Sequence, residues 1–258
     1  DRVLGLHFFN PAPIMPLVEV VSGEQTSQQT LEAGARFVTA LGKTAVVCRD
    51  APGFIVNRVN RSFTLEALRM LEAGEAGVEQ VDQAIVGAGY PMGPFALMDL
   101  VGIDVNFAVA TSLFQAFGNA VRFAPSPIQR QLVESGRLGR KTGEGFYRYE
   151  GGRQVGVSGR LESAGVDEPA ARELPPDEMV SRIELAIINE AYRAAGEGVA
   201  QPPDIDRAMR LGANHPHGPF ERAAALGLRR VIDELARFEA VLGERYAVAP
   251  SLWHIASI

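Results

Sequence analysis

The stretch GLHFFNP lies at residues 5–11, and the apolar run LVEVV follows at residues 17–21. A third run, DAPGFIVNR, occupies residues 50–58. Together these runs place a histidine, a carboxylate and side-chain amides close to strand-like segments. This is the kind of set that can move a proton between an enzyme and its substrate.

Composition predicts a soluble globular protein. The 258 residues are 47% hydrophobic and 22% charged, enough for one large core or two modest ones. The net charge of −6 argues against nucleic acid or an anionic membrane as the main partner. The single cysteine, Cys48, and the lack of an export signal favour the cytoplasm, and no apolar run reaches the roughly 20 residues that span a bilayer. Because the first residue is Asp1, we expect an excised segment of a longer polypeptide.

Periodicity divides the chain into four regions. Residues 1–50 predict a β-β-α-β segment, with strands at 3–9, 17–21 and 44–48 and a helix at 27–41. Three short strands and a helix form no stable sheet alone, so this segment is expected to be the remnant of a larger sheet. After the Pro52-Gly53 break the period becomes helical, and we expect a helical domain at 51–149, a linker at 150–177 and further helices at 178–258.

The last region repeats the first helical one. At an offset of 124 residues, identical residues recur in order: Arg58, Glu66, Ala67, Arg69, Gly74, Asp82 and Ala84 match Arg182, Glu190, Ala191, Arg193, Gly198, Asp206 and Ala208. Gly93-Pro94-Phe95 recurs one residue later as Gly218-Pro219-Phe220. The pattern predicts a duplicated helical domain whose second copy is structural and whose copies pack pseudo-symmetrically.

The motifs GLHFFNP, DAPGFIVNR and KTGEGFY, the last at residues 141–147, occur in the order found in the L-3-hydroxyacyl-CoA dehydrogenase family, which this chain resembles. The repeat resembles longer bacterial members, such as those of phenylacetate degradation, and the family as a whole implies fatty acid β-oxidation. The resemblance implies a mainly α fold: a duplicated 6-phosphogluconate-dehydrogenase-like C-terminal helical domain behind a small α/β remnant of a Rossmann domain. No G-x-G-x-x-G fingerprint occurs, so NAD is expected to be bound mainly by an upstream domain.

The resemblance also assigns roles to individual residues. His7 matches the catalytic histidine and Glu19 the carboxylate that orients it. Asn10 matches a residue near nicotinamide and substrate, Asn57 an amide over the substrate carbonyl, and Lys141 a lysine that reaches the cofactor. The implied partners are an acyl-CoA substrate and, for assembly, a homodimer or the packed helical copies. The implied reaction interconverts (S)-3-hydroxyacyl-CoA and 3-oxoacyl-CoA, and the fragment alone is expected to be inactive.

The residue types fit this chemistry even without the family resemblance. Oxidation of a secondary alcohol needs a base for the hydroxyl proton, and a histidine with a pKa near ~6.5 serves both directions. His7 needs a carboxylate to fix its tautomer, and Glu19 lies across a two-strand reversal. Asn10 and Asn57 are plausible donors to a developing alkoxide or a thioester carbonyl.

Each assignment has a simpler alternative. His7 could be a buried core histidine, Glu19 a structural salt bridge, Asn57 a helix cap and Lys141 a solvated surface charge. The His215-Pro216-His217 run matches no metal-ligand spacing and predicts a turn, so no metal is expected.

Two other functions stay open. The first is a non-catalytic acyl-CoA-binding or dimerisation module. The second is a sugar-nucleotide or hydroxy-acid dehydrogenase, which leaves the H-F-F-N-P run unexplained.

Overall fold

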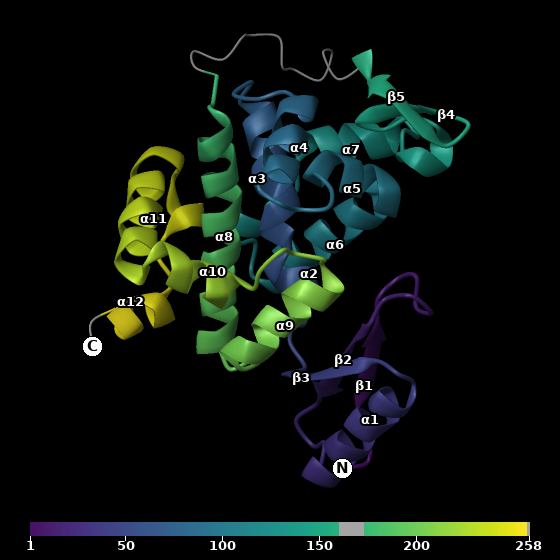
Figure 1. The fold of residues 1–258 in the computed structure, drawn as a ribbon, viewed down its shortest axis with the longest axis vertical. Helices are drawn as coiled ribbons and strands as arrows, with labels where there is room; N and C mark the ends of the chain where they lie inside the picture. Colours follow the sequence, from purple (N-terminus) through teal and green to yellow (C-terminus); the bar gives the residue numbers. More distant parts are fainter. Residues whose placement is uncertain (160–172, 257–258) are drawn as a thin grey trace. The chain divides into compact units, whose positions relative to one another are not determined.

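The computed structural model describes residues 1–159 and 173–256 (Figure 1). The chain divides into two compact units, which are described separately. Unit 1 comprises Asp1–Asn60 and Ile187–Ile258, and unit 2 comprises Arg61–Ala186. Among the described residues, no single helix has the length and apolar character to cross a bilayer. The helices α5 (Pro94–Val101) and α6 (Ile103–Ala116) meet that test only as a pair bent by 102°.

Unit 1 begins with the predicted β-β-α-β segment. It contains, in chain order, β1 (Gly5–Phe8), β2 (Leu17–Ser22), α1 (Gln28–Ala40), β3 (Thr44–Arg49), α2 (Val56–Val59), the second half of α8 (Pro176–Gly196), α9 (Pro202–Gly212), α10 (Pro219–Leu226), α11 (Leu228–Leu242), η4 (Glu244–Tyr246) and α12 (Pro250–Ala256). The sheet order is β1-β2-β3, with β1 antiparallel and β3 parallel to β2.

Helix α1 crosses one face of this sheet because both present apolar side chains there (Figure 1). Val18 and Val20 of β2 and Val38 of α1 are fully buried together. Ser27 caps the helix by accepting a hydrogen bond from the Thr30 backbone N–H. The parallel β2–β3 pair therefore has the helical crossover that such a connection requires.

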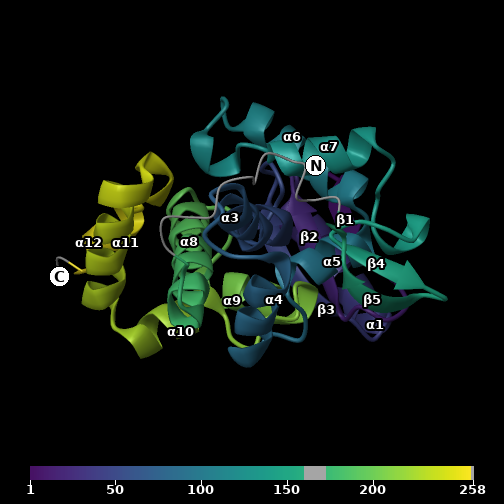
Figure 2. The same cartoon turned by 90° about the horizontal axis from the view of Figure 1, so that it is seen from above.

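Unit 2 is helical and ends in a β-hairpin. Its elements are α3 (Arg61–Glu72), α4 (Val78–Gly87), α5 (Pro94–Val101), α6 (Ile103–Ala116), η1 (Val121–Phe123), α7 (Pro127–Glu134), η2 (Arg140–Thr142), β4 (Tyr147–Glu150), β5 (Arg153–Val157) and the first half of α8. Strand β4 lies beside α5 (Figure 2). The hairpin occupies the start of the segment predicted as a linker, and residues 160–172 of that segment lie outside the described residues.

The predicted fold class is wrong in its arrangement. The α/β segment is not a small remnant placed before two successive copies of a helical domain, because α9 packs on β2 and β3 and joins residues 187–258 to the sheet in one compact unit. Some local features do recur at the predicted offset. Asp82 accepts hydrogen bonds from the first N–H groups of α5, and Asp206 does the same for α10. These local repeats do not divide the chain into two helical domains. The boundaries predicted at 50, 149 and 177 remain predictions.

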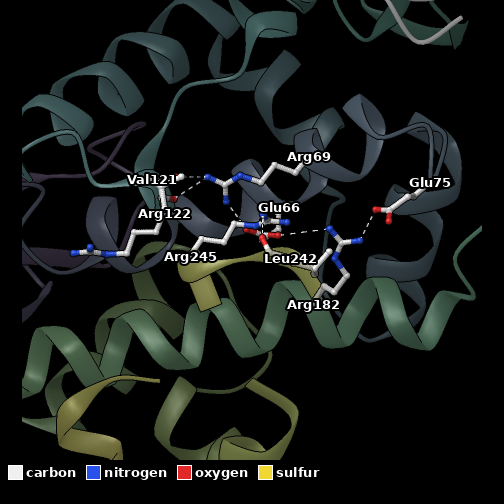
Figure 3. A network of polar contacts seen from close by, with 8 residues as sticks. All are labelled: Glu66, Arg69, Glu75, Val121, Arg122, Arg182, Leu242 and Arg245. Atoms are coloured by element: carbon white, nitrogen blue, oxygen red, sulfur yellow. Dashed lines mark hydrogen bonds and ion pairs between the residues drawn. The ribbon is translucent and has the colours of Figure 1, made fainter. Parts of the chain in front are cut away.

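Buried charges in unit 2 form ion pairs (Figure 3). Arg182 is 2% exposed, and its Nη1 donates to Glu75 Oε2 at 2.5 Å, while Glu66 Oε2 lies 3.9 Å from its Nη2. Arg69 pairs with Glu66 and donates to the Val121 carbonyl at 2.9 Å. The guanidinium groups of Arg69 and Arg182 therefore have carboxylate partners within the unit.

Two buried aspartates hold the hairpin to the helices. Asp82 accepts from the start of α5 and from the Tyr147 hydroxyl, each at 2.9 Å. Asp99 accepts from the backbone N–H groups of Phe146 and Tyr147 at 2.9 Å and from the Tyr149 hydroxyl at 3.0 Å. Burial raises the pKa of each carboxyl to about 6, although these hydrogen bonds oppose the rise.

This shift predicts a pH-dependent stability. The folded state holds the Asp82 proton up to about pH 6, whereas the unfolded chain releases it near 3.8, so this group's contribution to the free energy of unfolding falls as pH rises between those values. In Asp82→Asn, the fall between about pH 4 and pH 6 should be smaller than in the wild type. Urea denaturation across that range measures the slope, and an unchanged slope would contradict the role of Asp82.

Candidate functional site

His7 and Glu19 face each other across the first two strands. They are direct partners in the antiparallel β1–β2 register, which places both side chains on one face of the sheet. The His7 Nδ1–H donates to Glu19 Oε2 at 2.6 Å. The Glu19 side chain is fully buried, whereas the His7 side chain is 29% exposed. The structure therefore brings together the pair that the sequence suggested.

The second oxygen of Glu19 binds the start of α2. Glu19 Oε1 accepts from the backbone N–H of Ile55 at 3.1 Å and of Val56 at 2.9 Å. The preceding turn requires positive φ values, 74° at Gly53 and 46° at Phe54, and it turns these N–H groups toward the sheet. A buried carboxylate with three hydrogen bonds is well compensated, so Glu19 can remain an anion beside His7.

The geometry leaves one imidazole nitrogen for chemistry. Because Glu19 occupies Nδ1, Nε2 is the nitrogen available to take up or release a proton. The ring is held on its sides by Phe9 and Phe54, with ring centroids 4.7 and 5.5 Å away. A partly exposed, oriented imidazole differs from a buried core histidine, and it can act as a general acid or base.

The two asparagines lie close in sequence to residues that hold the His7–Glu19 pair in place: Asn10 follows β1, and Asn57 lies in α2. Asn10 is exposed in the turn after β1. Asn57 is partly buried in the first turn of α2, directly after the N–H of Val56 that binds Glu19. The N-cap residue of α2 is Ile55, which makes no side-chain cap, so the alternative of Asn57 as the helix cap is wrong. Substrate contacts of Asn10 and Asn57 stay predictions.

Lys141 lies in unit 2, in the short helix η2. Its Nζ donates to Asp104 Oδ1 at 2.5 Å, and this bond lowers the pKa of the Asp104 carboxyl. A Cβ atom at Gly102 would lie 2.9 Å from the same Nζ, and Gly102 has φ +106°, so only glycine fits beneath the lysine. Lys141 is thus an exposed residue in an ion pair, and its role toward a cofactor stays a prediction.

Residues far along the sequence support α2, and sequence reasoning missed them. Arg58 is 1% exposed and donates to Glu190 at 2.7 Å and to both oxygens of Glu197 at 2.7 and 3.0 Å. His215 lies in the predicted turn, and its Nε2–H donates to Asn60 Oδ1 at 2.8 Å.

Among residues 1–159 and 173–256, no three His, Cys, Asp or Glu side chains gather as metal ligands would.

The residues present do not supply a phosphate cradle for a dinucleotide. The turn between β2 and α1 contains one glycine, Gly23, and the sequence has no G-x-G-x-x-G run. The His7–Glu19 pair, by contrast, is held by hydrogen bonds among described residues of unit 1.

Comparison with protein families gives two matches. The 3-hydroxyacyl-CoA dehydrogenase NAD binding domain matches residues 1–51, and the C-terminal domain of the same enzymes matches residues 53–149 and 179–256. This chain belongs to the 3-hydroxyacyl-CoA dehydrogenase family. The first match assigns residues 1–51 to an NAD-binding domain, and their three strands form one sheet.

Individual relatives agree with the family. A 3-hydroxyadipyl-CoA dehydrogenase from Escherichia coli (strain K12) is 37% identical, over 95% of this chain and 67% of that protein. The mitochondrial hydroxyacyl-coenzyme A dehydrogenase of Sus scrofa is 49% identical over 58% of this chain and 48% of its own length. The crystal structure of a 3-hydroxybutyryl-CoA dehydrogenase from Escherichia coli K12 matches with a TM-score of 0.88 and 34% identity, covering 100% of this chain and 71% of that one. The chain thus spans about half to two thirds of these proteins.

Gly212 at the end of α9 allows that helix to approach the site. A Cβ atom there would lie 2.6 Å from Leu17 Cδ2, 3.0 Å from Val56 Cγ2 and 3.4 Å from Phe9 Cζ. Leu17 is fully buried and cannot swing away. The glycine therefore lets α9 contact both the strand that carries Glu19 and the helix that binds it.

Gly212→Ala should therefore destabilise the protein. Overpacking at such a contact costs about 1–3 kcal/mol of unfolding free energy. The matched control is Gly87→Ala at the end of α4, where nothing lies within 4 Å of the added Cβ, and we expect it to be neutral or slightly stabilising. Chemical denaturation measures both, and equal stabilities of the two variants would contradict the close contact.

Proposed function

We propose that this chain carries the proton-transfer centre of an NAD-dependent L-3-hydroxyacyl-CoA dehydrogenase that interconverts (S)-3-hydroxyacyl-CoA and 3-oxoacyl-CoA. The observation that supports it best is the 2.6 Å His7–Glu19 hydrogen bond, with Glu19 fixed by two N–H groups of α2. NAD, when bound, would supply the hydride acceptor for this reaction. All other steps concern side chains of this chain.

In the oxidative direction, His7 Nε2 takes the proton of the substrate hydroxyl while the C–O bond becomes a carbonyl. The resulting imidazolium is stabilised by the Glu19 carboxylate, which keeps its negative charge because three donors surround it. In reduction, the same nitrogen returns the proton. The side-chain amides of Asn10 and Asn57 donate hydrogen bonds to substrate oxygens, and Lys141 contributes to cofactor binding.

The proposed reaction does not by itself specify the acyl group of the substrate. The two Escherichia coli relatives are named for 3-hydroxyadipyl-CoA and 3-hydroxybutyryl-CoA, and a Vibrio campbellii relative, 33% identical over 98% of this chain, is a fatty acid oxidation complex subunit alpha. An adipyl chain ends in a carboxylate and a butyryl chain in a methyl group. We propose a short acyl-CoA substrate, in phenylacetate degradation or fatty acid oxidation.

The first test is NADH oxidation with acetoacetyl-CoA by the full-length protein that contains this sequence. His7→Gln should lower turnover by about 10²–10⁴-fold, since it removes the general acid and base. The 258-residue chain is assayed beside it and should be inactive. Wild-type inactivity would favour the acyl-CoA-binding module instead, and near-wild-type turnover by His7→Gln would remove His7 from the mechanism.

Glu19→Gln tests the second member of the pair. The amide can still accept from His7, but it carries no charge to stabilise the imidazolium that forms when His7 takes up the substrate proton. The pH profile of kcat/KM for alcohol oxidation should therefore differ from that of the wild type. A profile that coincides with the wild type would contradict the coupling of the two residues.

A further inference from the structure

Phe54, which lies just before α2 in unit 1, has a backbone conformation that phenylalanine rarely adopts. Its φ is +46°, in the left-handed region where a bulky side chain is crowded against its own backbone. In the described part of the chain, the other non-glycine residues of this region are Asn119 and Asn214, with φ of 64° and 55°. Asparagine is several-fold enriched there, so Phe54 is the conformational outlier of the three.

The turn before α2 explains the conformation of Gly53 but not that of Phe54. The Phe54 N–H donates to the Ala51 carbonyl at 2.9 Å, which closes a four-residue turn with Pro52 and Gly53 at its centre. Proline followed by a residue of positive φ, 74° at Gly53, is the pattern of a type II turn. Phe54 is the last residue of this turn, where positive φ is not required. Its conformation therefore needs another cause.

The left-handed conformation of Phe54 aims the next two peptide groups at Glu19. The N–H groups of Ile55 and Val56 both donate to Glu19 Oε1, at 3.1 and 2.9 Å. Ile55 is fully buried and Val56 is 4% exposed, so the packing of both side chains holds the segment in this path. Unfavourable torsions persist where the surroundings determine them in this way, and they cluster at functional sites.

The side chain of Phe54 contacts the other partner of Glu19. Its ring centroid lies 5.5 Å from that of the His7 imidazole, with the two planes tilted by 57°. Phe9 contacts the same imidazole at 4.7 Å, edge-on. Because the backbone conformation sets the direction in which Cβ leaves the chain, the torsion that aims the two N–H groups also sets where this ring lies. Glycine would relieve the strain but would remove the contact with His7.

We propose that Phe54 is a positioning residue for proton transfer, whose ring holds the His7 imidazole in the orientation that keeps its Nδ1–H on Glu19. This inference rests on the proposed function, because it takes His7 as the acid and base of the reaction. It explains why phenylalanine occupies a position whose backbone favours glycine. The strain is offset by the packing of the ring on His7 and by the two hydrogen bonds to Glu19.

Three substitutions in the full-length protein test the ring. Phe54→Ala and Phe54→Gly both remove it, and each should lower kcat for acetoacetyl-CoA reduction by about 10–100-fold with KM within about threefold, since a misplaced catalytic group slows the reaction rather than weakening binding. Phe54→Tyr keeps the ring and should retain kcat within about threefold. Unchanged kcat without the ring would overturn the inference. A raised KM at wild-type kcat would do the same, because it would indicate a contact with substrate.

Urea denaturation of the same variants tests the strain. Phe54→Gly should unfold at a higher urea concentration than Phe54→Ala, because glycine adopts positive φ at no steric cost, yet the two should share the same low kcat. The matched control is Asn119→Gly in the exposed turn after α6, which removes another left-handed side chain and should leave kcat unchanged. A kcat that recovers in Phe54→Gly together with stability would overturn the inference, since it would indicate a structural role only.

The tautomer of His7 tests the inference without turnover. The ¹⁵N chemical shifts of the two ring nitrogens are far apart in a fixed neutral tautomer and approach each other when tautomers exchange, and His7→Gln identifies the signals. At about pH 8.5, where an ordinary histidine is neutral, the wild type and Phe54→Tyr should show a protonated Nδ1, as the 2.6 Å bond to Glu19 requires. In Phe54→Ala the two shifts should approach each other.

This measurement separates the inference from the proposed reaction. Exchanging tautomers in Phe54→Ala beside a fixed tautomer in the wild type would support Phe54 as the positioning residue even if the enzyme acted on no acyl-CoA. The same fixed tautomer in both proteins would overturn the inference even if Phe54→Ala were slow, and so would exchanging tautomers in the wild type.

Discussion

The buried carboxylate of Glu19 is the constraint on which unit 1 depends. An anion with no exposed surface must be surrounded by donors, and Glu19 draws them from two places at once: the imidazole of β1 and the backbone N–H groups that open α2. One side chain thereby fixes the register of β1 against β2, the direction in which α2 leaves the sheet, and which ring nitrogen of His7 is left without this hydrogen bond. Removing its charge would loosen all three together.

The same rule for buried charge separates the buried arginines by their partners. Arg58 and Arg182 are each less than 3% exposed and each has carboxylate partners, so their charges are neutralised where the helices pack. Arg61 follows Arg58 by one turn of sequence and is buried as well, yet its partners are neutral amides. Arg61 thus differs from the other two because its charge has only amide partners among the described residues.

Short-range pattern was enough to predict the strands, α1 and the His7–Glu19 pair. Alternation predicts the strands, and a reversal between two adjacent strands places residues twelve apart in direct register. Long-range contacts were not predictable in this way. Arg58 and Glu190 are 132 residues apart, and nothing in either local sequence indicates that they meet. The fold class was wrong for the same reason, because the repeated residues indicate similar local structure but not which helices pack on the sheet.

The helices after residue 186 consequently have a more specific structural role than their sequence suggested, because they support α2. It was expected to be a structural copy, yet Glu190 and Glu197 hold the middle of α2, and Gly212 lets α9 touch both Leu17 and Val56. Glu19 can fix His7 only as firmly as α2 is fixed, since two of its three donors belong to that helix. A four-residue helix has little stability of its own, so residues 187–215 supply the rigidity that holds Glu19 and, through it, His7 in place.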